Sequence, residues 1–147
     1  MRFVVATLVL AVFLAPACGG GSSSNPAAPT PQTLEGTWRA TKAEFVKNNN
    51  TSIRTDIVAQ GSTLTLAFAG TNYTRTMTEP GYPQDVQTGT WSASKDVMTL
   101  RPAGVTWSIE FDMTFSANNL TLNGGSVQFD WTGTLEEAKL YMTLVRQ

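Results

Sequence analysis

The stretch that decides the fold is Val105-Thr-Trp107-Ser-Ile109-Glu-Phe111-Asp-Met113-Thr-Phe115-Ser116. Every odd position carries an apolar side chain and every even position a polar one. Side chains alternate between the two faces of a β-strand, so this pattern predicts a strand with one buried face and one solvated face. At ~3.3 Å per residue the strand would be about 40 Å long, and strands of that length usually bend where a sheet closes into a barrel.

The same alternation recurs on both sides of this stretch. It is clearest over residues 64–68, 73–77, 127–135 and 140–144, with shorter candidates over 36–45, 53–60, 88–93, 97–101 and 120–123. Turn-forming Asn, Gly, Pro and Ser residues separate these runs, and a helical turn is suggested only around residues 135–139. Residues 34–147 are therefore predicted to be all-β, a single antiparallel up-and-down barrel of about 8–10 strands. A β-sandwich is the alternative, but it uses longer crossovers than this spacing offers.

The composition excludes several classes of function. The chain has 147 residues, with 10 Lys and Arg, 11 Asp and Glu, no His and one Cys. Without His, the chain cannot build a Ser-His-Asp triad, a Cys-His pair or a His-based zinc site. A net charge of −1 gives no electrostatic support for binding nucleic acid. We therefore expect no enzyme activity, no metal, no cofactor and no nucleic-acid partner.

The first residues have the organisation of an export signal. Met1-Arg2 is a short basic start, Phe3–Leu14 is an almost unbroken apolar run, and Ala15-Pro16-Ala17 supplies the small residues of a cleavage site. A run of about 12 residues is too short to span a ~30 Å hydrocarbon core as a helix, but it suits a signal peptide. We expect residues 1–17 to be a signal peptide. An ordinary secretory peptide, which would leave Cys18 as an incidental thiol, is the alternative.

Residues 18–33 have the composition of a tether. Residues 19–24 are all Gly and Ser, and a Pro- and Ala-rich part without core-forming side chains follows them. This order predicts a flexible segment and then a stiffer one. It would hold the domain of residues 34–147 away from a surface to which Cys18 is attached.

The segment Leu14-Ala15-Pro16-Ala17-Cys18 resembles the signal of bacterial lipoproteins, in which small residues precede an acylated cysteine. The resemblance implies that acyl chains on Cys18 anchor the protein to a membrane of the cell envelope, and two or more such chains anchor stably. Gly19 after the cysteine is not an obvious inner-membrane retention signal. That favours the outer membrane of a Gram-negative bacterium.

Three motifs are similar to the lipocalin-like domains of bacterial lipoproteins, which are small calycin-type barrels. They are Leu34-Glu-Gly36-Thr37-Trp38 at the start, Thr88-Gly89-Thr90-Trp91-Ser92 in the middle and Lys139-Leu-Tyr-Met-Thr-Leu-Val-Arg146 at the end. The resemblance implies that Trp38 closes one end of the barrel and that Arg146 packs across its ring. A guanidinium over an indole contributes roughly 0.5–2 kcal/mol. Gly36 would let the first strand bend or approach a neighbour closely.

Side chains on the predicted inner face are the candidates for ligand contacts. Two interpretations stay open, because an eight-stranded barrel is just wide enough to be filled by side chains or to hold one small ligand. Arg75 shares a strand face with Tyr73 and Met77; if that face points inward, Arg75 is a candidate partner for a ligand carboxylate. The candidate ligand-binding residues are Arg75, Trp91, Trp107, Phe111, Phe129 and Trp131.

These observations favour a membrane-anchored, monomeric binding module for a small hydrophobic molecule such as an acyl chain. The alternative is an interaction or structural protein of the envelope, with a barrel filled by side chains and no small ligand, that binds another envelope protein. The volume left free inside the barrel distinguishes the two.

Overall fold

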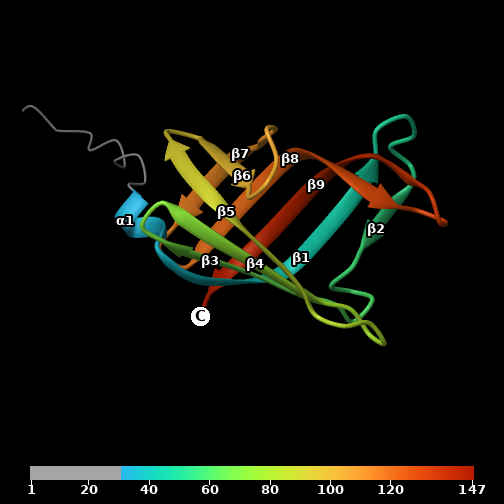
Figure 1. Cartoon of the computed structure of the whole chain (residues 1–147), viewed down its shortest axis with the longest axis horizontal. Coiled ribbons are helices and arrows are strands. Elements are labelled where there is room, and N and C mark those ends of the chain that lie inside the picture. The colour runs from blue at the N-terminus through green and yellow to red at the C-terminus, as the bar shows by residue number, and fades with distance from the viewer. Residues whose placement is uncertain (1–30) are drawn as a thin grey trace, which may run out of the picture.

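The computed structural model describes residues 31–147, which form one antiparallel β-sheet rolled into a barrel (Figure 1). The predicted all-β, up-and-down architecture is confirmed. No helix in this part of the chain is long and apolar enough to cross a bilayer. The elements are α1 (Pro31–Leu34), β1 (Gly36–Lys47), β2 (Arg54–Asp56), β3 (Thr63–Ala69), β4 (Asn72–Thr78), β5 (Asp85–Ser94), β6 (Val97–Pro102), β7 (Ile109–Ser116), β8 (Asn119–Asp130) and β9 (Leu135–Arg146).

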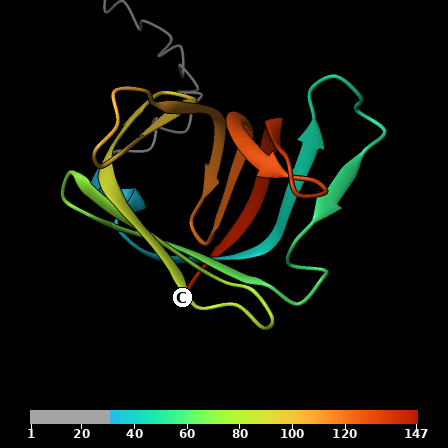
Figure 2. The same ribbon diagram turned by 45° about the vertical axis from the view of Figure 1, so that its right-hand side comes forward.

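The strands follow one another around the barrel almost in chain order. The order is β2-β1-β3-β4-β5-β6-β7-β8-β9, and β9 returns to pair with β1. Eight strands, β1 and β3–β9, therefore close the barrel, while β2 extends the sheet along the far end of β1 (Figure 2). The single continuous sheet excludes the β-sandwich.

Bulges bend the long strands of this barrel. Strands β1, β8 and β9 have 12 residues each. The register between β1 and β9 shifts between Ala40 and Lys42, and that between β8 and β9 shifts between Leu122 and Gly125. An extra residue on one strand bends it and increases its twist. Beyond its bend, β1 leaves β3, with which it pairs only over residues 36–39, and takes β2 as its neighbour over residues 44–46.

The predicted strand over residues 105–116 is wrong in its first third. β7 begins at Ile109, and residues 103–108 connect it to β6. β6 ends at Pro102, which has no N–H to offer to a neighbouring strand, and Gly104 then turns the chain with a φ of 80°. Trp107 therefore does not face the interior from a strand, and its side chain is 51% exposed. Residues 135–139, where a helical turn was suggested, instead begin β9.

Trp38 and Arg146 close the end of the barrel beside α1. Trp38 is fully buried and its Nε1 donates to the Leu34 carbonyl at 2.8 Å. The Arg146 guanidinium lies 4.3 Å from the centre of the Trp38 ring, which is the contact that the resemblance implies. Arg146 also donates to the carbonyls of Glu35, at 2.6 Å, and Thr33. Gly36, with a φ of 120°, leaves room for this guanidinium, because a Cβ there would lie 3.0 Å from Arg146 Nη1.

We expect Trp38 and Arg146 to be energetically coupled, because each loses the same contact when the other is removed. Trp38→Ala should lower the free energy of unfolding by roughly 3–5 kcal/mol, and Arg146→Ala by about 1–2 kcal/mol. The double variant should lose less than the sum in urea unfolding. Arg39→Ala, at an exposed position of β1, is the control and should change stability little. Strict additivity would contradict the coupling.

Candidate ligand-binding cavity

Side chains fill the half of the barrel beside α1. The Trp38 ring meets the edge of Phe115, with ring centroids 6.0 Å apart, and Phe68 packs on Trp91 at 4.7 Å. Leu120 and Leu144 are fully buried as well. Trp91, a predicted ligand contact, belongs to this filled half and does not line the cavity in the other half.

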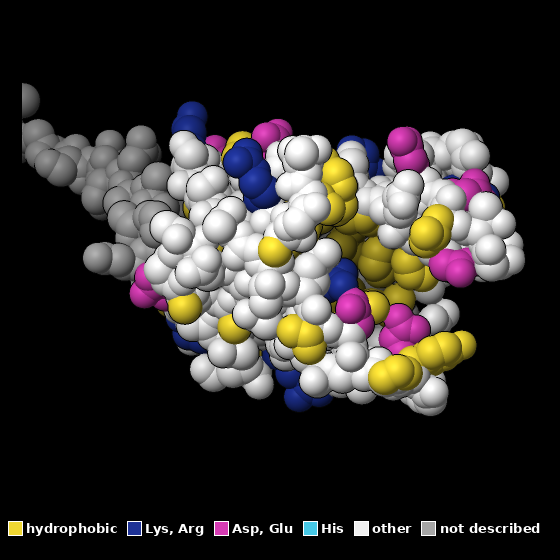
Figure 3. Space-filling view, viewed as in Figure 1, with side chains coloured by type: hydrophobic (Ala, Val, Ile, Leu, Met, Phe, Trp, Pro, Cys, Tyr) yellow, Lys and Arg dark blue, Asp and Glu magenta, His cyan; other side chains and the backbone are white. Residues whose placement is uncertain are grey.

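The other half of the barrel holds a cavity of about 350 Å³ that opens away from α1. Figure 3 shows the hollow with hydrophobic side chains on its walls. Polar side chains lie at its mouth: Gln60, Glu79, Gln128 and Asp130. The apolar walls include Leu64, Leu66, Leu100, Ile109, Leu140 and Met142. The barrel is therefore filled at one end and hollow at the other. The prediction of a filled interior describes the half beside α1, and the prediction of a ligand cavity describes the other half.

Two glycines allow aromatic rings of the cavity wall to pack closely against neighbouring strands. A Cβ on Gly125 of β8 would lie 2.1 Å from Phe111 Cε1, and a Cβ on Gly89 of β5 would lie 2.6 Å from Tyr73 Cε1. Both distances are far too short for real atoms, so each ring occupies space that a side chain at the glycine would need. The rings are thus held at the wall and not in the centre of the barrel. A glycine inside a strand often marks such a close approach, so Gly89 and Gly125 were the sequence signals for these contacts.

Arg75 faces the interior, which resolves the orientation that the sequence left open. It lines the cavity and lies opposite Gln87 in the β4–β5 ladder. Its guanidinium forms an ion pair with Asp85, while its Nε is buried and has no hydrogen-bond partner in the described part of the chain. A ligand with a hydrogen-bond acceptor would satisfy this donor. Gln87 was not predicted, because the strand expected over residues 88–93 began after it, whereas β5 begins at Asp85.

The environment of Tyr73 in the cavity shifts the pKa of its hydroxyl. Its hydroxyl lies 3.5 Å from Gln87 Oε1. Burial raises the pKa of Tyr73 above the ordinary value of 10.0, and the nearby positive charge of Arg75 partly opposes this shift. Desolvation dominates because a phenolate loses more hydration than a neutral phenol does. The hydroxyl is therefore a neutral donor at physiological pH.

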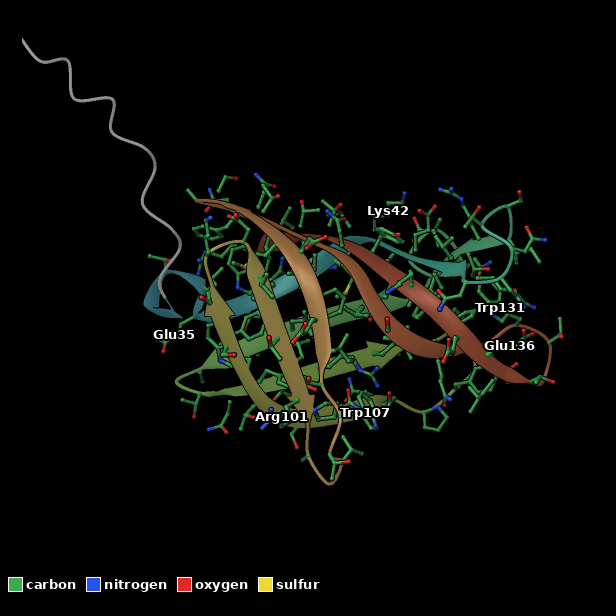
Figure 4. All side chains as sticks on the ribbon, turned by 90° about the horizontal axis from the view of Figure 1, so that it is seen from above. Glu35, Lys42, Arg101, Trp107, Trp131 and Glu136 are labelled. Carbon is green, nitrogen blue, oxygen red and sulfur yellow. The ribbon has the colours of Figure 1, made fainter. Side chains whose placement is uncertain are left out.

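The remaining predicted aromatic residues occupy three different positions. Phe111 is buried and lines the cavity, as does Phe129, which stacks on Phe45 with ring centroids 4.1 Å apart. Trp131 packs edge-on against Phe129 at 4.9 Å. Trp107 lies apart from these rings, on the loop between β6 and β7 (Figure 4). The structure thus brings Arg75, Phe111 and Phe129 into one cavity.

A family model for the lipocalin-like domain matches residues 34–122. The chain belongs to this family. Comparison with curated proteins gives no match, and comparison with solved structures gives none. The family match begins just before β1 and ends within β8 at the bulge.

Membership of the lipocalin-like family bears on the kind of function. Lipocalin-like domains are generally binding proteins rather than enzymes, and this barrel fold points to a small-molecule binding module. Over residues 31–147, no group of three or more His, Cys, Asp or Glu side chains is placed to hold a metal ion. The apolar cavity of this lipocalin-like domain is therefore the candidate binding site.

Replacing Tyr73 by Phe should remove part of the loss of stability at alkaline pH. Folding raises the pKa of Tyr73, so its contribution to stability is fully present below pH 10.0 and is lost as the pH rises through the raised value. Urea unfolding at about pH 9 and about pH 11 should show a larger loss for the wild type than for Tyr73→Phe. Tyr82→Phe, at a side chain 70% exposed, should lose as much as the wild type. Equal losses in wild type and Tyr73→Phe would show that the phenol is not desolvated.

Proposed function

We propose that this lipocalin-like domain binds a small hydrophobic molecule, with a single acyl chain as the model ligand. The observation that carries the proposal is the cavity of about 350 Å³, which is apolar along its walls, blocked toward Trp38 and open at the other end. Known ligand pockets have about 300–1,000 Å³, mostly apolar linings and a few polar groups that orient the ligand. A volume near the lower limit favours a slender ligand.

The apolar walls supply enough binding energy for such a ligand. Burying ten methylenes contributes up to about 8 kcal/mol before the costs of ordering the chain. This corresponds to a dissociation constant of roughly 1 μM at best. The buried Nε of Arg75 would fix the orientation of any acceptor that the ligand carries.

The alternative function, an interaction protein without a small ligand, needs a barrel filled by side chains. Only the half beside α1 has that property, where Trp38, Phe68, Trp91 and Phe115 pack together. The other half holds the cavity of about 350 Å³, which side chains leave open. The small-ligand proposal is therefore the stronger one.

We further propose that the protein is a monomer held by lipid on Cys18 at the outer membrane of a Gram-negative cell envelope. Cys18, the signal peptide of residues 1–17 and most of the tether lie outside the described residues, so the support is the sequence resemblance and the Gly/Ser-rich composition. The chain joins the barrel through α1, at the closed end (Figure 1). A tether attached there leaves the mouth of the cavity unobstructed.

Filling the cavity should abolish binding without unfolding the barrel. Val127 lines the cavity from β8, so Val127→Phe should weaken binding of the neutral fluorescent probe N-phenyl-1-naphthylamine at least about tenfold. Thr121→Phe adds the same ring to the opposite face of the same strand and should bind the probe as the wild type does. Circular dichroism checks that both variants fold. No fluorescence change with the wild type, up to the solubility limit of the probe, would favour the interaction protein.

Removing the thiol of Cys18 should release the protein from the membrane. Acyl chains are the only anchor that the resemblance implies, so Cys18→Ser should move the full chain from the membrane fraction to the soluble fraction of cells that express it. Ser22→Ala, in the predicted tether, is the control and should stay with the membrane. Equal membrane retention of Cys18→Ser would refute the lipid anchor.

A further inference from the structure

The barrel wall is open between β7 and β8 on the side of the mouth. These strands pair only from Asp112–Asn123 to Ser116–Asn119, although β7 starts at Ile109 and β8 continues to Asp130. Along the unpaired stretches, β7 stays with β6 and β8 stays with β9, so the two strands part. Backbone N–H and C=O groups on both edges of this gap lack a strand partner, which makes the edges a hydrogen-bonding surface.

The gap connects the apolar cavity with the outside. A hollow of about 420 Å³ lies on its outer side and one of about 560 Å³ on its inner side. Ser108 from one lip and Ser126 from the other line both hollows, so the two meet at the gap. The inner hollow also shares lining residues with the cavity: Arg75, Gln87, Ile109, Val127 and Gln128. A ligand seated in the cavity therefore has a route for its polar end through the wall.

The chemistry of the gap differs from that of the cavity. Trp107 lines the inner hollow at the gap. Its side chain is half exposed and is not part of the buried core. Hydroxyl and amide groups line the same hollow, from Ser108, Ser126, Gln87 and Gln128. A flat aromatic face beside amides and hydroxyls suits a ring with C–H groups on its faces and hydroxyls on its edge.

The charges around the gap disfavour an anionic ligand head. Of the described residues that line the cavity and the inner hollow, Glu79, Asp130 and Glu137 are acidic and Arg75 alone is basic. Asp85 already forms an ion pair with Arg75. A carboxylate head would thus meet an excess of negative charge. A neutral acceptor would accept a hydrogen bond from the unpartnered Arg75 Nε without that repulsion.

We propose that the gap between β7 and β8 selects an amphiphile with an uncharged, hydroxyl-rich head, such as a monosaccharide, whose single chain lies in the cavity. This inference rests on the proposed function, because the ligand's apolar chain binds in the cavity while the gap contacts its head group. Trp107 stacks on one face of the head. The amides, the serine hydroxyls and the free strand edges bond its hydroxyls.

Three amphiphiles with the same dodecyl chain test the head selection: dodecyl β-D-glucoside, dodecanoate and dodecyltrimethylammonium. Each is added to the full chain below its micelle concentration, to displace N-phenyl-1-naphthylamine. We expect the glucoside to bind at least about tenfold more tightly than either charged compound. Trp107→Ala should weaken the glucoside roughly three- to tenfold and leave dodecanoate unchanged. Val105→Ala, on the same loop but outside the gap, should leave all three unchanged.

The outcomes separate the two proposals. Tightest binding by either charged amphiphile, equal binding of all three, or unchanged glucoside binding by Trp107→Ala would overturn the head selection and leave the cavity proposal standing. Failure of the probe itself to bind the wild type would overturn the proposed function, and the head selection with it. Because Trp107 is half exposed, its replacement leaves the buried core intact.

Discussion

The pairing of β9 with β1 is the constraint on which the rest of the structure depends. It joins the last strand of the chain to the first, from Trp38–Arg146 to Lys47–Ala138, and so turns a meander into a barrel. The cation–π contact of Arg146 with Trp38 and the hydrogen bonds of Arg146 to the backbone before β1 fix this seam at one end. At the other end β1 bends away from β3, so the same long strand closes the barrel and widens it.

The interior follows from this unequal shape. At the narrow end four aromatic rings fill the space, while at the wide end the cavity walls carry mainly aliphatic side chains. Phe111 and Tyr73 have rings as large as those of Phe68 and Phe115 in the filled end, yet they lie against Gly125 and Gly89 and leave the centre open. The cavity therefore depends on where the rings pack and not on a lack of large residues.

The position of the polar groups relates the cavity to its proposed role. Apolar contacts are not directional, so the apolar walls supply affinity for an alkyl chain but discriminate little between ligands. Selection requires groups with direction, and these lie where β7 and β8 part, together with Arg75 and Trp107. A complete wall would have paired the backbone N–H and C=O groups along β7 and β8 within the sheet.

The sequence by itself determined most of the strands, because alternation is a local property that each run of residues carries alone. Its resemblance to lipocalin-like domains also implied the contact of Trp38 with Arg146, which the structure confirms. Only the tertiary structure decided that Arg75 points inward, because β4 has threonines on its other face and threonine is tolerated on either side of a sheet. The place of Trp107 was decided in the same way: the alternation continues through residues 105–108, but β6 ends at Pro102 and leaves them no strand with which to pair. The cavity and the gap arise from strands far apart in the chain, so no local pattern contains them.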